Sequence, residues 1–582
     1  MRPRQQGGWL AGLAILLVTS TLRADAPGDP LRFVPDKANA IFKVEQPGKI
    51  ADLFLNHELS RQVRAIQVVA ELYDSTNARR FYQLLSYFEK QMGMSTLELL
   101  DKLAGGGIAV ASELGGGAPP VLLIVQGKDE AVVKKFFAIA LDVAEQELAR
   151  QDVKGGFKKK TYRDVDAYGF DKIAFARVGD AMLLATRSNA LKAAIDCYKD
   201  GSGSISKVKA LADARKALPK GPLAWGWLHL EPFHARPEFK EGIKTVSLQP
   251  LFFPVWPLAD VVERSPYVAA GIYQQGQEFM TTVRMGSGMK GMSERAALLM
   301  PSAKEASTLP LLKPANTLAS LSFHLDLGRF WENRKKLIPG KQEGMQLDQL
   351  EKASALFLGG VKLSTLLKQA GAHHRLVAVQ QTKSVYKTTP NQPIPGFAWV
   401  IEMRDPEFAR SMETILRGAG LLASTQANLK MVEEKHGPHK IVSYRFPEDR
   451  KFGNDTGSIR FNFSPAFVKS GKQMILSSTV ELARELADLV AQEGPTRGST
   501  ASTHWQFYAT GGAAALRSAE KQLRTQYILS QALSPKEAQD QIRQLIALVE
   551  RLGVLTIETN YGAGDFRLDI RLNLDHAREA RD

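Results

Sequence analysis

Apolar residues recur along this chain at the spacings typical of helices and strands. Residues 129–150 predict the clearest helix, because Asp129 can cap the first turn and a broad apolar face follows it. That face consists of Val132, Val133, Phe136, Phe137, Ala140, Val143, Ala144 and Leu148. Residues 50–66 show the same helical spacing of apolar side chains.

Short apolar runs separated by glycine predict β-hairpins. Residues 108–111 and 121–125 flank Gly115-Gly116-Gly117, and residues 269–273 and 279–285 flank Gln274-Gln275-Gly276. Residues 223–230 alternate as a half-buried strand does. Because hairpins dominate, the sequence predicts an α+β fold with largely antiparallel sheets and packed helices.

The same order of motifs occurs twice along the chain. The matched pairs are Ala38-Asn39 with Ala315-Asn316, Ser95-Thr96-Leu97 with Ser364-Thr365-Leu366, residues 121–125 with 398–401, residues 182–196 with 474–488, and Tyr273-x-x-Gly276 with Tyr561-x-x-Gly564. Their common order predicts an internal duplication into two pseudo-symmetric lobes. The expected copies are residues 31–285 and 311–575, with a Gly- and Pro-punctuated linker at 286–310.

The first residues have the order of an export signal. Arg2 and Arg4 precede an apolar run at 9–18, and small residues follow at Ala24 and Ala26. Ten apolar residues are too few to cross a bilayer, and no later run is longer, so no transmembrane anchor is expected after cleavage. We expect a signal peptide at 1–24, cut after Ala24 or Ala26, and a periplasmic or secreted protein. An uncleaved N-terminal anchor is the alternative.

Length and composition indicate a folded protein of two or more domains. The chain has 582 residues, of which 44% are hydrophobic and 24% are charged. Its single cysteine, Cys197, excludes an internal disulfide. No activating neighbour is visible in the sequence, so we interpret Cys197 as a small buried residue rather than a nucleophile.

The chain is basic, with a formal net charge of +15. The densest basic segment is Lys154, Lys158, Lys159, Lys160 and Arg163, which we interpret as a loop and as a candidate polyanion-binding site. A solvated loop without a ligand is the alternative. The expected partners are an acidic envelope polymer or another envelope protein. Nucleic acid is not expected, because only Phe157 and Tyr162 accompany these cations.

The sequence motifs identify no catalytic, cofactor-binding or metal-binding residue. The sequence lacks a phosphate-binding loop, a zinc-binding helix motif and a nucleophile elbow. Residues 204–207 match S-x-x-K, but a helix cap explains them better. His373 and His374 are expected on opposite faces of a strand, and His436 and His439 in a turn. Trp225, Trp227 and residues 252–256 predict core packing, with a ligand platform as the alternative.

The strand-to-helix unit at 182–196, the stretch 162–173 before it and the exported, duplicated plan resemble a known family. It is a domain-of-unknown-function family of large exported bacterial proteins, found in planctomycetes. The resemblance implies architecture and location, and it carries no catalytic residues. The second copy departs most at 383–395 and 450–458, which have the character of loop insertions.

Three hypotheses for function follow. The preferred one is an exported, non-enzymatic binding or scaffolding protein. The alternatives are an extracytoplasmic hydrolase with a site between the lobes, and a carrier of an apolar ligand between sheet and helices. A flat face with an aromatic or basic patch favours the binding protein, a large dry cavity the carrier, and a pocket of convergent polar groups the hydrolase.

Overall fold

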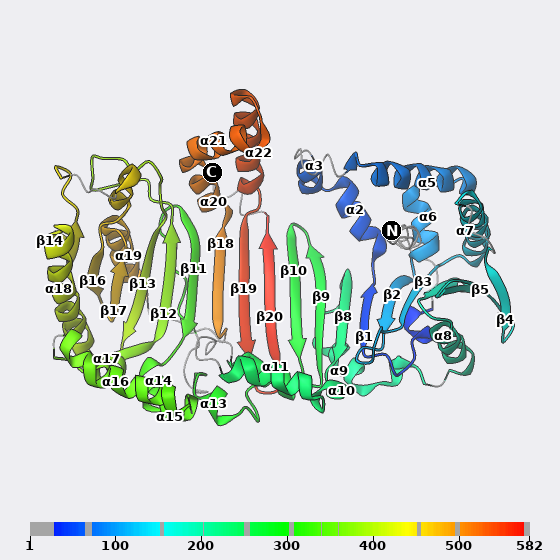
Figure 1. Ribbon diagram of the computed structural model, residues 1–582, viewed down its shortest axis with the longest axis horizontal. Helices are drawn as coiled ribbons and strands as arrows, with labels where there is room; N and C mark the ends of the chain where they lie inside the picture. Colours follow the sequence, from blue (N-terminus) through cyan, green and yellow to red (C-terminus); the bar gives the residue numbers. More distant parts are fainter. Residues whose placement is uncertain are drawn as a thin grey trace, which may run out of the picture. The chain divides into compact units, whose positions relative to one another are not determined.

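A computed structural model describes residues 28–64, 73–151, 156–201, 203–248, 256–301, 308–338, 340–358, 360–450, 455–494 and 501–574. The chain divides into two compact units. Unit 1 runs to Lys240 and includes Arg264–Gly286, and unit 2 consists of Glu241–Glu263 and the chain from Ser287. Each unit combines an antiparallel sheet with packed helices, which confirms the predicted α+β class (Figure 1). The predicted signal peptide lies outside the described residues.

The strands of unit 1 are hydrogen-bonded in the order β4-β5-β6-β7-β3-β2-β1-β8-β9-β10, and every neighbouring pair is antiparallel. Their bounds are β1 Ala40–Val44, β2 Gly107–Ser112, β3 Val121–Gln126, β4 Lys158–Tyr162, β5 Val165–Phe170, β6 Ile173–Val178, β7 Ala181–Ala185, β8 Ala224–His229, β9 Tyr267–Gln275 and β10 Glu278–Met285. The pairs β2–β3 and β9–β10 confirm the two predicted hairpins.

The helices of unit 1 cover both faces of its sheet. They are α2 Pro47–Asn56, α3 Glu58–Arg64, α5 Thr76–Met92, α6 Thr96–Ala104, α7 Glu130–Arg150, α8 Ser188–Asp200, α9 Lys209–Ala217 and α10 Glu231–His234, with 3-10 turns η1 Pro30–Phe33 and η2 Ile205–Lys207. Ile108 packs in the cluster that includes α5 to α7, while its neighbour Ala109 packs in the cluster that includes α8 and α9. The predicted helix after Asp129 is confirmed. The Asp129 side chain caps it by accepting hydrogen bonds from the Ala131 and Val132 amides.

The strands of unit 2 follow the order β14-β15-β16-β17-β13-β12-β11-β18-β19-β20, again antiparallel throughout. Their bounds are β11 Thr317–His324, β12 Ala370–Val379, β13 Gly396–Met403, β14 Lys430–His436, β15 His439–Arg445, β16 Ala466–Ser470, β17 Gln473–Ser477, β18 Thr503–Tyr508, β19 Val554–Tyr561 and β20 Phe566–Asn573. Counted from the first strand of each unit, the order matches that of unit 1. Residues 474–488 occupy β17 and α19, as residues 182–196 occupy β7 and α8.

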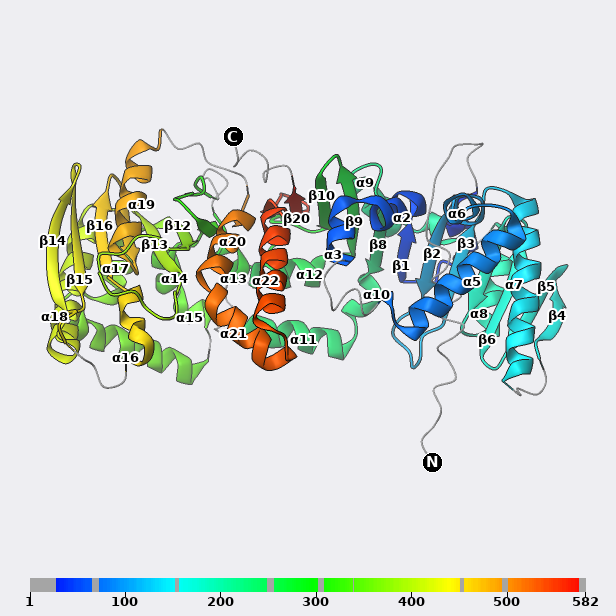
Figure 2. The same cartoon turned by 90° about the horizontal axis from the view of Figure 1, so that it is seen from above.

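The helices of unit 2 begin with α11 Pro237–Leu248 and α12 Trp256–Arg264, most of whose residues belong to it. The others are α13 Glu294–Ala297, α14 Leu327–Glu332, α15 Arg334–Leu337, α16 Lys341–Phe357, α17 Leu363–Gln369, α18 Glu407–Ala427, α19 Val480–Gln492, α20 Ala509–Ser518, α21 Glu520–Gln531 and α22 Pro535–Glu550, with the 3-10 turn η4 Thr456–Asn462. Figure 2 shows α18 and α19 on opposite faces of the sheet. Within the predicted linker, Leu299 packs against Trp256 and Leu337. None of the helices in the described ranges is long and apolar enough to cross a membrane.

Candidate ligand-binding face

Unit 2 carries large apolar side chains in two rows across one face of its sheet. The first row, from β13 to β20, is Trp399, Leu376, Leu321, Trp505, Ile557 and Ile570. The second row is Phe397, Ala378, Ala319, Phe507, Leu555 and Leu572. Residues directly opposite on neighbouring strands point to the same side, as do residues two apart on one strand. These twelve side chains therefore share one surface, which we call the apolar face.

Five large side chains of the apolar face are exposed. The exposed fractions are 58% for Phe397, 39% for Leu376, 38% for Trp505, and 37% for both Trp399 and Phe507. Since the rows cross six strands about 4.8 Å apart, the face is roughly 24 Å wide. Exposed large apolar side chains gathered on one side of a sheet are typical of an interaction site.

The reverse side of β18 to β20 is polar. Arg571 forms ion pairs with Glu558 at 2.6 Å and with Asp569 at 3.0 Å. His504 lies on the same side, and burial lowers the pKa of its imidazole. An antiparallel sheet with one polar side normally turns its apolar side to a core. On the side patterned for a core, Trp505 and Phe507 of β18 are exposed, and the apolar residues of β19 and β20 are only partly buried.

Helices cover only part of this side of the sheet. Ile401 and Met403, further along β13, are buried in a cluster with Phe408 of α18. That cover ends before Trp399 and Phe397, which are exposed. The helices α20 to α22 lie beyond the ends of β18 and β19 rather than across their face (Figure 1). The apolar face is therefore open to a ligand at its five exposed side chains, while Leu321 of β11, between them, is buried.

The chemistry of the apolar face suits hydrocarbon. None of its twelve residues carries a charge or a side-chain hydrogen-bonding group apart from the indole N–H groups of Trp399 and Trp505. The Trp505 and Phe507 rings stack at 6.0 Å between centroids. In the adjoining row the hydroxyls of Thr503 and Thr559 bond to each other at 2.7 Å, so they are already satisfied.

The structure places the candidate polyanion residues at one end of the sheet of unit 1. The interpretation of the segment as a loop is wrong for Lys158, Lys159 and Lys160, which belong to β4. Lys154 lies outside the described residues. Lys159 pairs with Asp166 at 2.7 Å, and Arg163 pairs with two aspartates of α8. Within the described ranges Lys158 and Lys160 have no ion-pair partner, so they are the available cations of this group.

The other residues considered from sequence have structural roles. Cys197 is buried, its thiol donates to the Val34 carbonyl at 3.5 Å, and burial raises the pKa of that thiol. Ser204 caps η2, while the Lys207 ammonium donates to the Gly201 carbonyl rather than approaching Ser204. The core placement of Trp225 and Trp227 is confirmed by their burial. Residues 252–255 lie outside the described residues, and Trp256 is buried.

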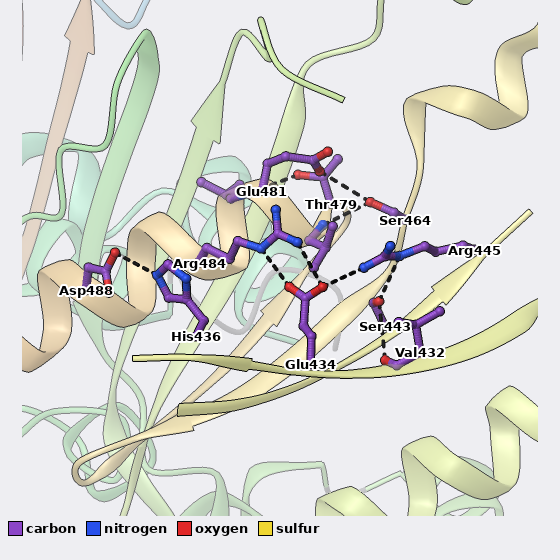
Figure 3. A network of polar contacts seen from close by, with 12 residues as sticks. Val432, Glu434, His436, Ser443, Arg445, Ser464, Thr479, Glu481, Arg484 and Asp488 are labelled. Atoms are coloured by element: carbon purple, nitrogen blue, oxygen red, sulfur yellow. Dashed lines mark hydrogen bonds and ion pairs between the residues drawn. The ribbon is translucent and has the colours of Figure 1, made fainter. Parts of the chain in front are cut away.

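Three of the four histidines considered from sequence make side-chain hydrogen bonds. His373 bonds Glu402 at 2.7 Å, and His374 bonds the Leu325 carbonyl at 2.9 Å. His436 lies in β14, His439 begins β15, and the His436 ring contacts Asp488 at 2.8 Å (Figure 3). No group of three or more His, Cys, Asp or Glu in the described part of the chain is arranged to hold a metal ion.

The network in Figure 3 fastens α19 to the β14–β15 hairpin. Glu434 accepts from Arg484 of α19 at 2.6 Å and from Arg445 of β15 at 2.7 Å. These guanidinium groups, Arg484 foremost, hold the pKa of Glu434 below its ordinary value. The network therefore holds α19 against the side of the unit 2 sheet that lies opposite the apolar face.

Comparisons with known proteins identify no family. No family profile matches the chain, and no curated protein matches it. Two crystal structures of TP0453 are similar to it. Crystal form I has a TM-score of 0.22 and 10% identity, and covers 46% of this chain and 83% of that chain. Crystal form III has a TM-score of 0.17 and 9% identity, and covers 81% of this chain and 100% of that chain.

Proposed function

We propose that this protein is an exported, non-enzymatic binding protein whose unit 2 holds the hydrocarbon chain of an anionic amphiphile on the apolar face. The observation that carries the proposal is an open, uncharged apolar surface on strands whose reverse side is polar. A saccharide is a poorer fit, because this face offers it few hydrogen bonds. The net charge of +15 favours a negative headgroup, as a fatty acid has.

The apolar face supplies enough energy for reversible binding. Each buried methylene contributes about 0.8 kcal/mol, so fourteen of them contribute about 11 kcal/mol. Loss of translational and rotational freedom offsets at least about 4 kcal/mol. The remainder corresponds to a Kd on the order of 10 µM if the hydrocarbon chain is fully buried, and to weaker binding where one side of the chain stays in water.

Export and duplication support the setting of this function. The N-terminal order of Arg2, Arg4, the apolar run 9–18 and Ala24 supports secretion to the periplasm or the medium. The matching strand orders of the two units support an internal duplication with copies at 31–285 and 311–575. N-terminal sequencing of the exported protein is expected to begin near Asp25 or Pro27, and recovery of Met1 contradicts cleavage.

Quenching by a brominated fatty acid tests the binding site. Bromine atoms on the bound chain are expected to quench Trp399 and Trp505, which are exposed on the apolar face. Replacing both by Phe is then expected to remove most of the quenching. Trp331→Phe is the control, because Trp331 is buried in α14 of the same unit. Absence of quenching, or quenching that survives the double replacement, refutes the proposal.

A further inference from the structure

A cavity of about 520 Å³ lies within unit 2, away from the residues of the apolar face. Its walls come from the β12–β13 connection at 380–394, from η4, and from the ends of α20 and α21 that adjoin each other. The corresponding connections of unit 1 are residues 113–120 and the turn Asp171-Lys172. One of the two segments that have the character of insertions, residues 383–395, thus supplies much of the lining, whereas no described residue of the other, 450–458, lines the cavity.

Hydrogen bonds fix the main wall of the cavity. The Glu448 carboxylate accepts from the backbone amide of Thr388 at 2.8 Å and from its hydroxyl at 2.8 Å. These bonds, the backbone amide first, hold the pKa of Glu448 below its ordinary range. Further along, the Asn462 side chain accepts from the Ile394 amide at 2.8 Å. The wall is therefore preformed, as ligand pockets usually are.

Glu481, in the first turn of α19, supplies the carboxylate of the cavity. Its Oε2 accepts from the Ser464 hydroxyl at 3.4 Å (Figure 3). Its Oε1 is buried and has no hydrogen-bond partner among the described residues. Since a buried acceptor without a donor is costly, the Glu481 carboxylate gains a hydrogen bond if a small rotation of its side chain turns this oxygen toward a donor in the cavity.

The remaining lining offers both donors and acceptors. Amide and hydroxyl side chains dominate it, among them Gln380, Gln381, Thr389, Asn391, Ser518 and Gln522. Two rings, Tyr386 and Phe461, lie 4.9 Å apart between centroids. Apart from Glu481, the lining charges are Lys383 and Lys521.

We propose that this cavity binds a saccharide unit, with one sugar hydroxyl donating to the Glu481 carboxylate. A sugar is uncharged and both donates and accepts, which matches a lining of amides and hydroxyls, and its apolar edge suits an aromatic ring. A phosphate would face the Glu481 carboxylate, and a divalent cation would find one carboxylate where it needs several oxygen ligands. Most glycosidases use two carboxyl groups, and Glu481 is the one carboxylate among the described residues that line the cavity, so the proposal is for binding alone.

Calorimetry and saturation-transfer NMR with glucose, N-acetylglucosamine, cellobiose and chitobiose test the proposal on the full-length protein. At least one of these sugars is expected to bind at millimolar or lower concentration. Glu481→Gln removes the charged acceptor and is expected to weaken that binding on the order of tenfold or more. Glu407→Gln, at an exposed site of α18 in the same unit and outside the lining, is the control and keeps wild-type affinity.

A second variant guards against a folding defect. Ser518 is an exposed residue of α20 that lines the cavity, so Ser518→Trp fills the space without disturbing the core. This variant is expected to abolish sugar binding while its thermal unfolding stays near that of the wild type. No binding of any of the four sugars overturns the inference, and so does binding that both Glu481→Gln and Ser518→Trp leave unchanged. Fatty-acid quenching serves as an independent readout, since the two sites share no residue.

Discussion

Replacing Phe397 by Ser tests whether the apolar face is an open ligand-binding surface or is covered in the folded protein. Full burial of a phenylalanine side chain contributes about 1.5–3 kcal/mol, and Phe397 is 58% exposed, so it contributes roughly 1 kcal/mol to folding. Ile475, on the opposite side of the same sheet, is fully buried. Ile475→Ala is therefore expected to cost about 2–5 kcal/mol.

Urea unfolding with and without fatty acid measures both effects. The urea unfolding transition whose midpoint is lowered by Ile475→Ala is assigned to unit 2. At a hundred times the Kd, ligand is expected to stabilise the wild-type unit by about 2.7 kcal/mol. If Phe397→Ser weakens binding tenfold, the same concentration stabilises the variant by only about 1.4 kcal/mol. Phe54→Ser, at an exposed site of unit 1, is the control and leaves ligand stabilisation unchanged. A loss of 2 kcal/mol or more in Phe397→Ser without ligand would show that the face is covered, and the reasoning would fail.

Two further predictions concern charge. Replacing Lys158 and Lys160 together by Gln is expected to lower salt-sensitive retention on an anionic polysaccharide column. Lys159→Gln is expected to lower it less, because Lys159 already pairs with an aspartate. Equal retention of the wild type and both variants refutes a polyanion role. Stability is expected to change by at most about 0.5 kcal/mol. Arg484 lowers the pKa of Glu434 from 4.5, so the stability this carboxylate adds is present above pH 4.5 and lost as pH falls through its lower folded value. Acid unfolding of Glu434→Gln should therefore depend less on pH in that window, and an unchanged profile contradicts the assignment.

Local sequence signals predicted local structure well. The Asp129 cap and the glycine-punctuated hairpins depend on neighbouring residues, so they can be read without knowing the fold. The strand Lys158–Tyr162 was missed because consecutive lysines show no apolar alternation. Such lysines are common on outermost strands, where they hinder further strand pairing, and β4 pairs with β5 alone among the described strands.

Neither candidate site could be predicted from sequence. Trp505 and Phe507 alternate with polar residues, which predicts a half-buried strand but not which side a helix covers. The cavity brings together residues 380–394 and Lys521, which are far apart in the chain. Only the insertion character of 383–395 pointed toward it, because insertions in loops often carry function.

The two exposed aromatic rings of β18 have no counterpart in β8 of unit 1, although both sheets have the same strand order and the corresponding side of unit 1 exposes Phe42 and Ile272, at 47% and 42%. Ala38-Asn39 and Ala315-Asn316 precede the first strand of each unit, which makes Phe42 the counterpart of Ala319. Phe42 pairs with Gly226, whereas Ala319 pairs with Phe507. Two residues away on the neighbouring strand, Ala224 of unit 1 takes the place of Trp505. Unit 1 therefore has small residues where unit 2 has two exposed aromatic rings. The shared fold therefore does not itself require an aromatic pair on this strand, and what distinguishes unit 2 is the position of its exposed rings rather than the presence of an exposed apolar side.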